Sequence, residues 1–207
     1  MPTTLQDVQD RITLDYLNRT NLNSVVIRAV QAAIRHYERK RWPWNETTTT
    51  LTASNGQLTL TVPSDFISLD LLEIQYQSAT YSLSRRSFEE VRELNVTGNE
   101  NKNLPTSFAQ RGDSFYLAPI PDSAYLVNCH YLQKLPELSS NSMTSTNAWL
   151  SAAEDLIVYH ATKLVWANTL RNTEEATKYA QLERDAYTDL RTYTEQRVNN
   201  ALRATKF

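Results

Sequence analysis

Glycine and cysteine are scarce in this sequence, and each scarcity excludes a class of site. Only three of the 207 residues are glycines and one is a cysteine. Phosphate-binding loops need glycine because it lets the backbone approach a phosphate or adopt a positive φ. A single cysteine cannot form an internal disulfide or a four-cysteine metal site. We therefore expect neither a common nucleotide-binding enzyme nor a disulfide-stabilised domain.

Long apolar runs and a surplus of one charge are also missing. No run reaches the roughly 18 apolar residues that cross a bilayer. The first residues lack the basic start and apolar centre of a signal peptide. The formal net charge is -2, which gives no overall electrostatic reason to bind nucleic acid. We expect a protein made in a reducing cytoplasm, with no membrane partner.

Amphipathic helices are predicted at both ends of the chain. Apolar residues spaced three and four apart indicate helices over 3–18 and 24–41, and two more after a polar linker at 139–147. The last helix is expected to run to about residue 199 or beyond. The candidate N-terminal caps are Thr4 with Asp7, Asn21 or Asn23, Ser151 with Glu154, and Asn172 with Glu175.

The middle of the chain has the alternation of β-strands. Threonine-rich runs flank Asn55 and Gly56, a pair that favours a hairpin turn. A second hairpin is predicted around Gly112 and Asp113. The remaining expected elements are strands at 69–76, 81–83 and 124–131, and a short helix at 88–94 opened by Ser87 and Glu90.

Helices at the ends with strands between them indicate an α+β protein. We predict a helical bundle built from the N-terminal and C-terminal helix pairs, residues 1–44 and 145–207. An antiparallel β-rich subdomain, residues 45–144, is then inserted into it. Residues 45–140 hold 11 Asp and Glu against six Lys and Arg, so the predicted insertion is acidic.

Candidate catalytic residues do not form a recognisable set. Cys129 and His130 are adjacent in a predicted strand and face opposite sides of it, so they cannot act as nucleophile and base. His36 and His160 have no carboxylate or histidine three or four residues further along the same helix. A small hydrolase using His160 or His130 remains an alternative, but we predict no catalytic residues, no metal and no cofactor.

Three basic or charged motifs each allow two interpretations. The run from Arg35 to Trp42 mixes cations and aromatics, which suits either DNA phosphate or the C-terminal end of a helix. The C-terminal cations are either a solvated face or an arm that docks on a partner. The tripeptide Arg111, Gly112 and Asp113 matches an adhesion tag, but the alternation around it favours a plain hairpin turn.

A series of short motifs resembles the head-to-tail connector, or adaptor, proteins of tailed bacteriophages, especially short-tailed ones. Their order and spacing carry the resemblance, which covers nearly the whole chain. Val62 stands where the family usually has leucine, and the linker and the C-terminal extension are long. The motifs are 62–66 (VPSDF), 115–122 (FYLAPIPD), Ala124 with Tyr125, Tyr131, Leu135 with Pro136, Leu138 with Ser139, and Trp149 with Leu150.

The resemblance implies a non-enzymatic structural protein of the virion, at the head–tail junction. Family members form a ring, usually of twelve copies, below the portal protein. The helical part meets the portal, the β part meets the next tail component, often a nozzle, and genomic DNA passes through without being read. We predict portal docking by Arg191, Tyr193, Arg197, Arg203 and Phe207, tail-partner docking by Asn55, Gly56, Arg111, Gly112 and Asp113, and a channel lining at Glu89 and Glu90.

Overall fold

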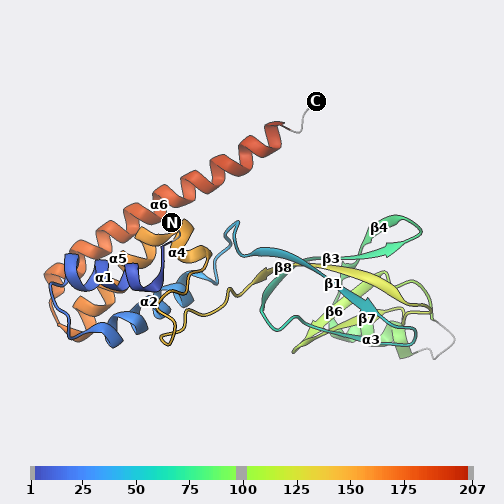
Figure 1. Cartoon of the computed structure of the whole chain (residues 1–207). Coiled ribbons are helices and arrows are strands. Elements are labelled where there is room, and N and C mark those ends of the chain that lie inside the picture. The colour runs from blue at the N-terminus through green and yellow to red at the C-terminus, as the bar shows by residue number, and fades with distance from the viewer. Residues whose placement is uncertain (1–2, 97–101, 205–207) are drawn as a thin grey trace. The chain divides into compact units, whose positions relative to one another are not determined.

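A computed structural model describes residues 3–96 and 102–204 of the chain. The protein is a mixed α+β protein, as predicted. It divides into two compact units. We call Met1–Trp44 with Leu135–Phe207 the helical unit, and Asn45–Lys134 the β unit. Figure 1 shows the strands and one short helix in the β unit, and the other helices in the helical unit.

The second boundary of the β unit differs from our expectation of residue 144. Residues 135–144, which include the first part of the predicted linker, belong to the helical unit, and Leu138 is only 3% exposed in the helical core. The side-chain amide of Gln31 donates to the Leu138 carbonyl at 2.9 Å, and the backbone N–H of Gln6 donates to the Met143 carbonyl at 2.9 Å. Hydrogen bonds to main-chain carbonyls do not depend on residue type, so the polar composition of this segment could not predict that it packs against the helices.

The helical unit contains four longer helical stretches and one short helix among its described residues. Two of the stretches change from α to π geometry near their C-terminal ends. In Figure 1, α6 continues past the other helices of its unit. The elements are α1 (Leu5–Asp10) with η1 (Arg11–Tyr16), α2 (Asn23–Tyr37), α4 (Ala148–Ala152), α5 (Glu154–Leu164) with η3 (Val165–Thr169), and α6 (Thr173–Ala204).

The predicted N-terminal caps are right for the first and last helices of this unit. Thr4 and Asp7 form a complete capping box. The side chain of Asn172 accepts the backbone N–H of Glu175 at 3.1 Å. These caps satisfy N–H groups that have no partner within the helix.

Two other cap predictions are wrong. α2 begins after Leu22, which offers no side-chain cap, and it ends at Tyr37 rather than at residue 41. Ser151 lies inside α4, whose cap is Asn147. Asn147 stands two residues before the first large apolar side chain of that helix, so a polar residue in the linker takes the role that we gave to Ser151.

Residues in the left-handed region end both π segments. Asn18 has φ 49° and Arg171 has φ 54°. In each turn a backbone N–H reaches back six residues, from Arg19 to the Thr13 carbonyl and from Asn172 to the Trp166 carbonyl. This bond spans one residue more than the 6→1 bond of a Schellman C-terminal cap, the related motif in which glycine is the usual left-handed residue. A glycine-poor chain uses asparagine and arginine there instead.

The helical unit is built around one apolar core, in which α5 packs against both α2 and α6. Trp42 and Trp149 are fully buried, with their rings edge to face at 6.1 Å. Trp44 stacks on Trp42 with ring centres 5.0 Å apart. The aromatic residues that follow α2 therefore close the core rather than face solvent.

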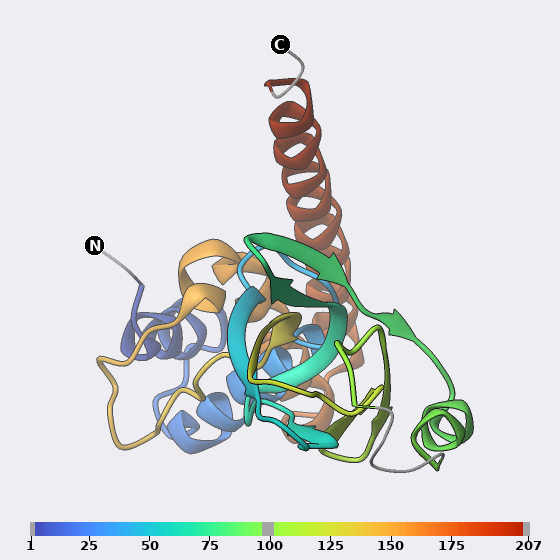
Figure 2. The same cartoon turned by 90° about the vertical axis from the view of Figure 1, so that its right-hand side faces the viewer.

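The β unit contains two four-stranded sheets. Sheet A has the order β1-β8-β3-β4 and sheet B the order β2-β7-β6-β5. Figure 2 shows the strands curving around a shared interior, with α3 outside them. The elements are β1 (Glu46–Ala53), β2 (Thr59–Thr61), β3 (Phe66–Tyr76), β4 (Ala79–Ser82), β5 (Ser84–Arg85), α3 (Phe88–Val96), β6 (Ser107–Arg111), β7 (Ser114–Ala118) and β8 (Tyr125–Gln133).

The predicted hairpin at Asn55 and Gly56 is wrong in its pairing. Gly56 does adopt a positive φ of 76°, but the turn carries the chain from sheet A to sheet B. β1 pairs with β8 and β2 pairs with β7. The Asn55–Gly56 pair therefore predicted the turn correctly. It could not predict the pairing, because alternating threonines are compatible with many partner strands.

Other predictions for the β unit are confirmed. β6 and β7 pair antiparallel through the two-residue turn at Gly112, with Arg111 opposite Ser114. Ser87 and Glu90 exchange hydrogen bonds at the start of α3. In β8 the side chains predicted to share one face are all buried in the common core: Tyr125, Val127, Cys129 and Tyr131.

No helix among residues 3–96 and 102–204 is long and apolar enough to cross a membrane.

Candidate docking groove

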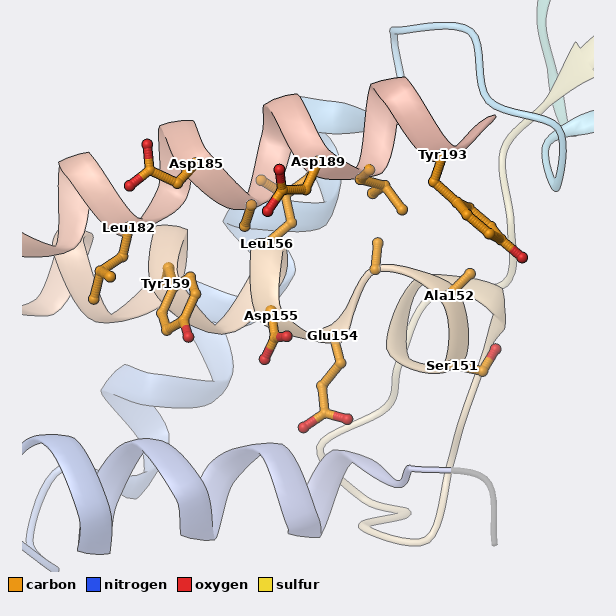
Figure 3. Close-up of a pocket in the computed structure, with 13 residues that line it drawn as sticks. Ser151, Ala152, Glu154, Asp155, Leu156, Tyr159, Leu182, Asp185, Asp189 and Tyr193 are labelled. Carbon is orange, nitrogen blue, oxygen red and sulfur yellow. The ribbon is translucent and has the colours of Figure 1, made fainter. Parts of the chain in front are cut away.

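A groove of about 560 Å³ lies between the α4–α5 junction and α6 in the helical unit. Figure 3 shows Asp185, Asp189 and Tyr193 along α6, and Glu154 and Asp155 at the start of α5, among the residues that line the groove. The rest of its lining is small or apolar: Ala152, Ala153, Leu156, Leu182, Ala186 and Leu190, with Ser151 and Tyr159. The groove thus has an apolar floor and an acidic rim.

The groove exists because the helical path breaks at Ala153. This residue has φ -134° and ψ 29°, so α4 and α5 are separate helices. Small side chains at Ala152 and Ala186 leave the space between the two walls open. A larger residue at either position would fill part of the groove.

The acidic rim is only partly neutralised within the chain. Arg11 forms ion pairs with Glu154 at 2.7 Å and with Asp155 at 2.6 Å. Burial alone would lower the pKa of Arg11, but its hydrogen bonds to the two carboxylates raise that pKa. Asp185 accepts a bond from Gln181 at 2.8 Å. Four carboxylates and one guanidinium leave a formal charge of -3 around the groove.

A family model described as SU10 adaptor protein matches residues 3–205 of the chain. The chain belongs to the SU10 adaptor protein family. The match spans both units and all of α6, and it confirms the resemblance to phage head-to-tail adaptors. No curated protein matches the chain.

The residues predicted to dock on the portal differ in their exposure and contacts in the structure. Tyr193 is 61% exposed and lies at the rim of the groove. Arg191 is half-buried on another side of α6, where its guanidinium lies 5.4 Å from the centre of the Trp42 ring. Arg197 and Arg203 belong to the helical backbone of α6, and Phe207 lies outside the described residues.

The predicted tail-side residues lie at two turns of the β unit. Asn55 is exposed beside Gly56, whose N–H donates to the Pro121 carbonyl at 2.8 Å. At the other turn, the guanidinium of Arg111 lies 4.3 Å from the centre of the Phe88 ring. The Arg111 side chain is therefore held against α3, while Gly112 and Asp113 are exposed.

Glu89 and Glu90 are both exposed on the first turn of α3. Glu90 accepts bonds from the backbone N–H of Ser87 at 2.9 Å and from its hydroxyl at 3.0 Å. These bonds lower the pKa of Glu90. Glu90 thus already serves as a helix cap, and Glu89 is the freer carboxylate of the two.

The basic and aromatic run at 35–42 does not present its aromatics to a ligand. Tyr37 is 3% exposed and Trp42 is fully buried. The ammonium group of Lys40 lies 4.3 Å from the centre of the Tyr187 ring of α6. Stacking of nucleic-acid bases needs exposed aromatic rings, which this run does not provide. Its aromatic and basic residues instead form the contact between the C-terminal end of α2 and α6.

A buried polar network in the helical unit was missed by the sequence analysis. Glu183 of α6 accepts a bond from Tyr37 at 2.5 Å and pairs with His160 at 2.7 Å and with Lys163 at 2.5 Å. The ring of His36 stacks on that of His160 with centres 4.8 Å apart. The partner of His160 comes from another helix, so a search along the same helix could not find it.

A signal for this network does exist in the sequence. Glu183 is four residues after Tyr179 and four before Tyr187, which places a carboxylate in the apolar stripe of α6. Burial would raise the pKa of Glu183, but hydrogen bonds from His160, Lys163 and Tyr37 lower it to about 2. Both carboxylate oxygens are occupied, so the network is a structural element rather than a reactive one.

His130 belongs to a second, more open set of polar contacts. Its Nδ1 lies 2.8 Å from the Thr48 hydroxyl and its Nε2 lies 3.1 Å from the Glu73 carboxylate. These side chains lie on the outer face of sheet A, beside an equivalent bond between Thr50 and Asn128 at 3.1 Å. The repeated hydroxyl-to-partner contacts are cross-strand pairs that stabilise a sheet.

No group of three or more His, Cys, Asp or Glu side chains that could hold one metal ion lies within residues 3–96 and 102–204. Cys129 is fully buried and its pKa is raised to about 11 by burial, which disfavours the reactive thiolate.

Proposed function

We propose that this protein is a head-to-tail adaptor that forms a ring under the portal and joins the capsid vertex to the tail. The match of the family model over residues 3–205 carries this proposal, because it includes both the helical and the β unit. The family is one of phage structural proteins. Assembly on the vertex of a short-tailed phage, with DNA passing through the ring, is the role that this architecture fits.

The helical unit is the proposed portal-binding side. The groove beside Tyr193 offers an apolar floor, an acidic rim and an exposed aromatic residue, and aromatic residues are enriched at protein interfaces. The positions after Tyr193 add Arg197, Arg203 and Phe207 in the sequence. Arg191 supports this surface indirectly, because it donates to the Arg41 carbonyl at 3.1 Å and holds α6 against the end of α2.

The β unit is the proposed tail-binding side. Its exposed turns at Asn55–Gly56 and Gly112–Asp113 are candidates for contact with a nozzle or another tail protein. Glu89 is the proposed channel residue, since a negative surface repels passing DNA instead of retaining it. Reversal of this charge in Glu89→Lys should slow genome ejection, and unchanged ejection kinetics would remove the channel assignment.

The portal assignment is tested by binding measurements on matched variants. We expect Tyr193→Ala to weaken co-sedimentation with the portal ring of the same phage, and deletion of the residues after 196 to weaken it further. Leu126→Ala is the control, because Leu126 is 47% exposed but belongs to the β unit, where its strand β8 has a neighbour on each side. Equal portal binding by all three variants and the wild type would contradict the assignment to the helical unit.

A further inference from the structure

Sheet A ends in two strands that have a partner on one side only. β1 pairs with β8 along all eight of its residues, in one unbroken register. β4 pairs with β3 from Ala79 to Ser82. In the part of the chain that the structure describes, neither strand has a neighbour on its other side. Each therefore presents a row of backbone N–H and C=O groups to its surroundings.

β1 lacks the features that normally prevent edge-to-edge association, and β4 has only one of them, its short length of four residues. Proteins usually protect an edge strand with charge, proline, a bulge or very short length. Sheet B follows this rule, since its edge strands β2 and β5 have three and two residues. In sheet A, β1 carries a single charged residue, Glu46 at its start, and β4 carries none. Neither strand contains a proline.

The two open edges have compatible directions. Each neighbouring pair in sheet A is antiparallel, so β4 runs opposite to β1 across the sheet. If β4 of one copy lies beside β1 of the next, the new pair is again antiparallel and the alternation continues. Such a contact joins two different surfaces, which is the kind of contact that closes into a ring.

The side chains at the two edges are also compatible. On β4, Thr80 pairs with Gln75 and so faces outward, while Tyr81 pairs with the buried Ile74 and faces the core side. On β1, Thr50 faces outward and Thr49 faces the core side, opposite buried Cys129. With Thr80 opposite Thr50, antiparallel pairing places Tyr81 opposite Thr49, and threonine–threonine and aromatic–β-branched pairs are favourable across strands.

We propose that β4 of one copy pairs with β1 of the next copy, so that sheet A becomes continuous between neighbouring subunits. The inference rests on the proposed ring and names the contact that builds it. The partner is a second copy of this chain, because the same sheet supplies both open edges and their directions agree. The helical unit is then left to bind the portal.

Cysteine cross-linking tests this pairing directly. The variant Thr80→Cys/Thr50→Cys places one thiol on each edge, both facing outward, and Thr80→Cys/Thr48→Cys tests the neighbouring register. Facing Cα atoms of antiparallel strands lie roughly 4.5–5.5 Å apart, within the range of a disulfide. The natural Cys129 is fully buried and does not interfere.

The matched control is Thr80→Cys/Thr47→Cys, because Thr47 pairs with buried Tyr131 and faces the opposite side of the sheet, without a cysteine directly across from it. Mild oxidation is applied to the chain alone at high concentration and to the chain bound to portal rings. We expect one outward-facing pair to shift the protein from monomer to a ladder of covalent oligomers. The control and each single variant should stay monomeric.

Two results would overturn the inference: no ladder from either outward-facing pair in both samples, or covalent dimers from Thr50→Cys alone, which would mean that β1 pairs with itself. Portal binding is scored separately by co-sedimentation. A ladder without portal binding would support the strand pairing and contradict the adaptor assignment. Portal binding without a ladder would do the reverse.

Discussion

The same pair of residue types, histidine and glutamate, appears once in each unit in opposite settings. In the helical unit His160 and Glu183 are 2.7 Å apart, with side chains 7% and 11% exposed. In the β unit His130 and Glu73 are 3.1 Å apart, with side chains 35% and 25% exposed. A buried pair leaves an uncompensated charge when one partner is removed, whereas a solvated pair does not. Burial, more than residue identity, decides what such a pair contributes.

The largest difference in stability is expected when the glutamate of each pair is replaced by alanine. We expect Glu183→Ala to lower the free energy of unfolding of the helical unit by about 3–5 kcal/mol, because His160 and Lys163 lose their buried partner. Glu73→Ala should cost less than about 1 kcal/mol. Denaturant titration followed by circular dichroism measures both. Similar costs for the two variants would contradict the comparison.

Acid should weaken the buried pair in a defined pH window. The pKa of Glu183 is about 2 in the folded protein against 4.5 for the unperturbed group. Because the pKa of Glu183 is lower in the folded than in the unfolded protein, its ionised carboxylate stabilises the fold at pH values above about 4.5. This stabilisation is lost as the pH falls from about 4.5 toward about 2. The loss should reach roughly 3 kcal/mol. It is measured as the difference in unfolding free energy between wild type and Glu183→Gln across this window, and a constant difference would contradict it.

A core truncation in the β unit should leave the helical unit unaffected. All four tryptophans, Trp42, Trp44, Trp149 and Trp166, belong to the helical unit, so their fluorescence reports that unit alone. Leu117 is fully buried in the β core, and Leu117→Ala should cost about 3 kcal/mol. We expect the circular dichroism transition to shift while the tryptophan transition stays in place. A joint shift would mean that the two units unfold together.

The smallest predicted difference concerns two capping boxes of the same kind. Thr4 caps α1 in the helical unit and Ser87 caps α3 in the β unit. Replacement of either by alanine should cost about 1 kcal/mol. Thr4→Ala should move the tryptophan transition and Ser87→Ala should not. The opposite assignment would contradict the division of the chain into these units.

Local signals in the sequence predicted much of each unit. The alternation at Tyr125, Val127, Cys129 and Tyr131 identified the buried face of β8, because a strand face depends only on a period of two. The capping boxes at Thr4 and Ser87 were identified for the same reason, since both partners lie within three residues. The turn at Gly112 also needs only its own backbone.

Features that depend on distant partners could not be predicted in the same way. Asn55 and Gly56 indicated a turn, but the pairing of β1 with β8 joins residues about 80 positions apart. Glu183 reaches His160 across 23 residues, and the groove forms only where α6 faces the break at Ala153. Each depends on which elements meet in space, and a single sequence does not specify this.

Electron microscopy of the purified chain mixed with the portal ring of the same phage tests the central claim most directly. The account predicts rings of this protein stacked on the portal, with the helical unit toward it, and no such stacks from either protein alone. A chain that never joins the portal at any mixing ratio, while its variants fold normally, would contradict the adaptor assignment.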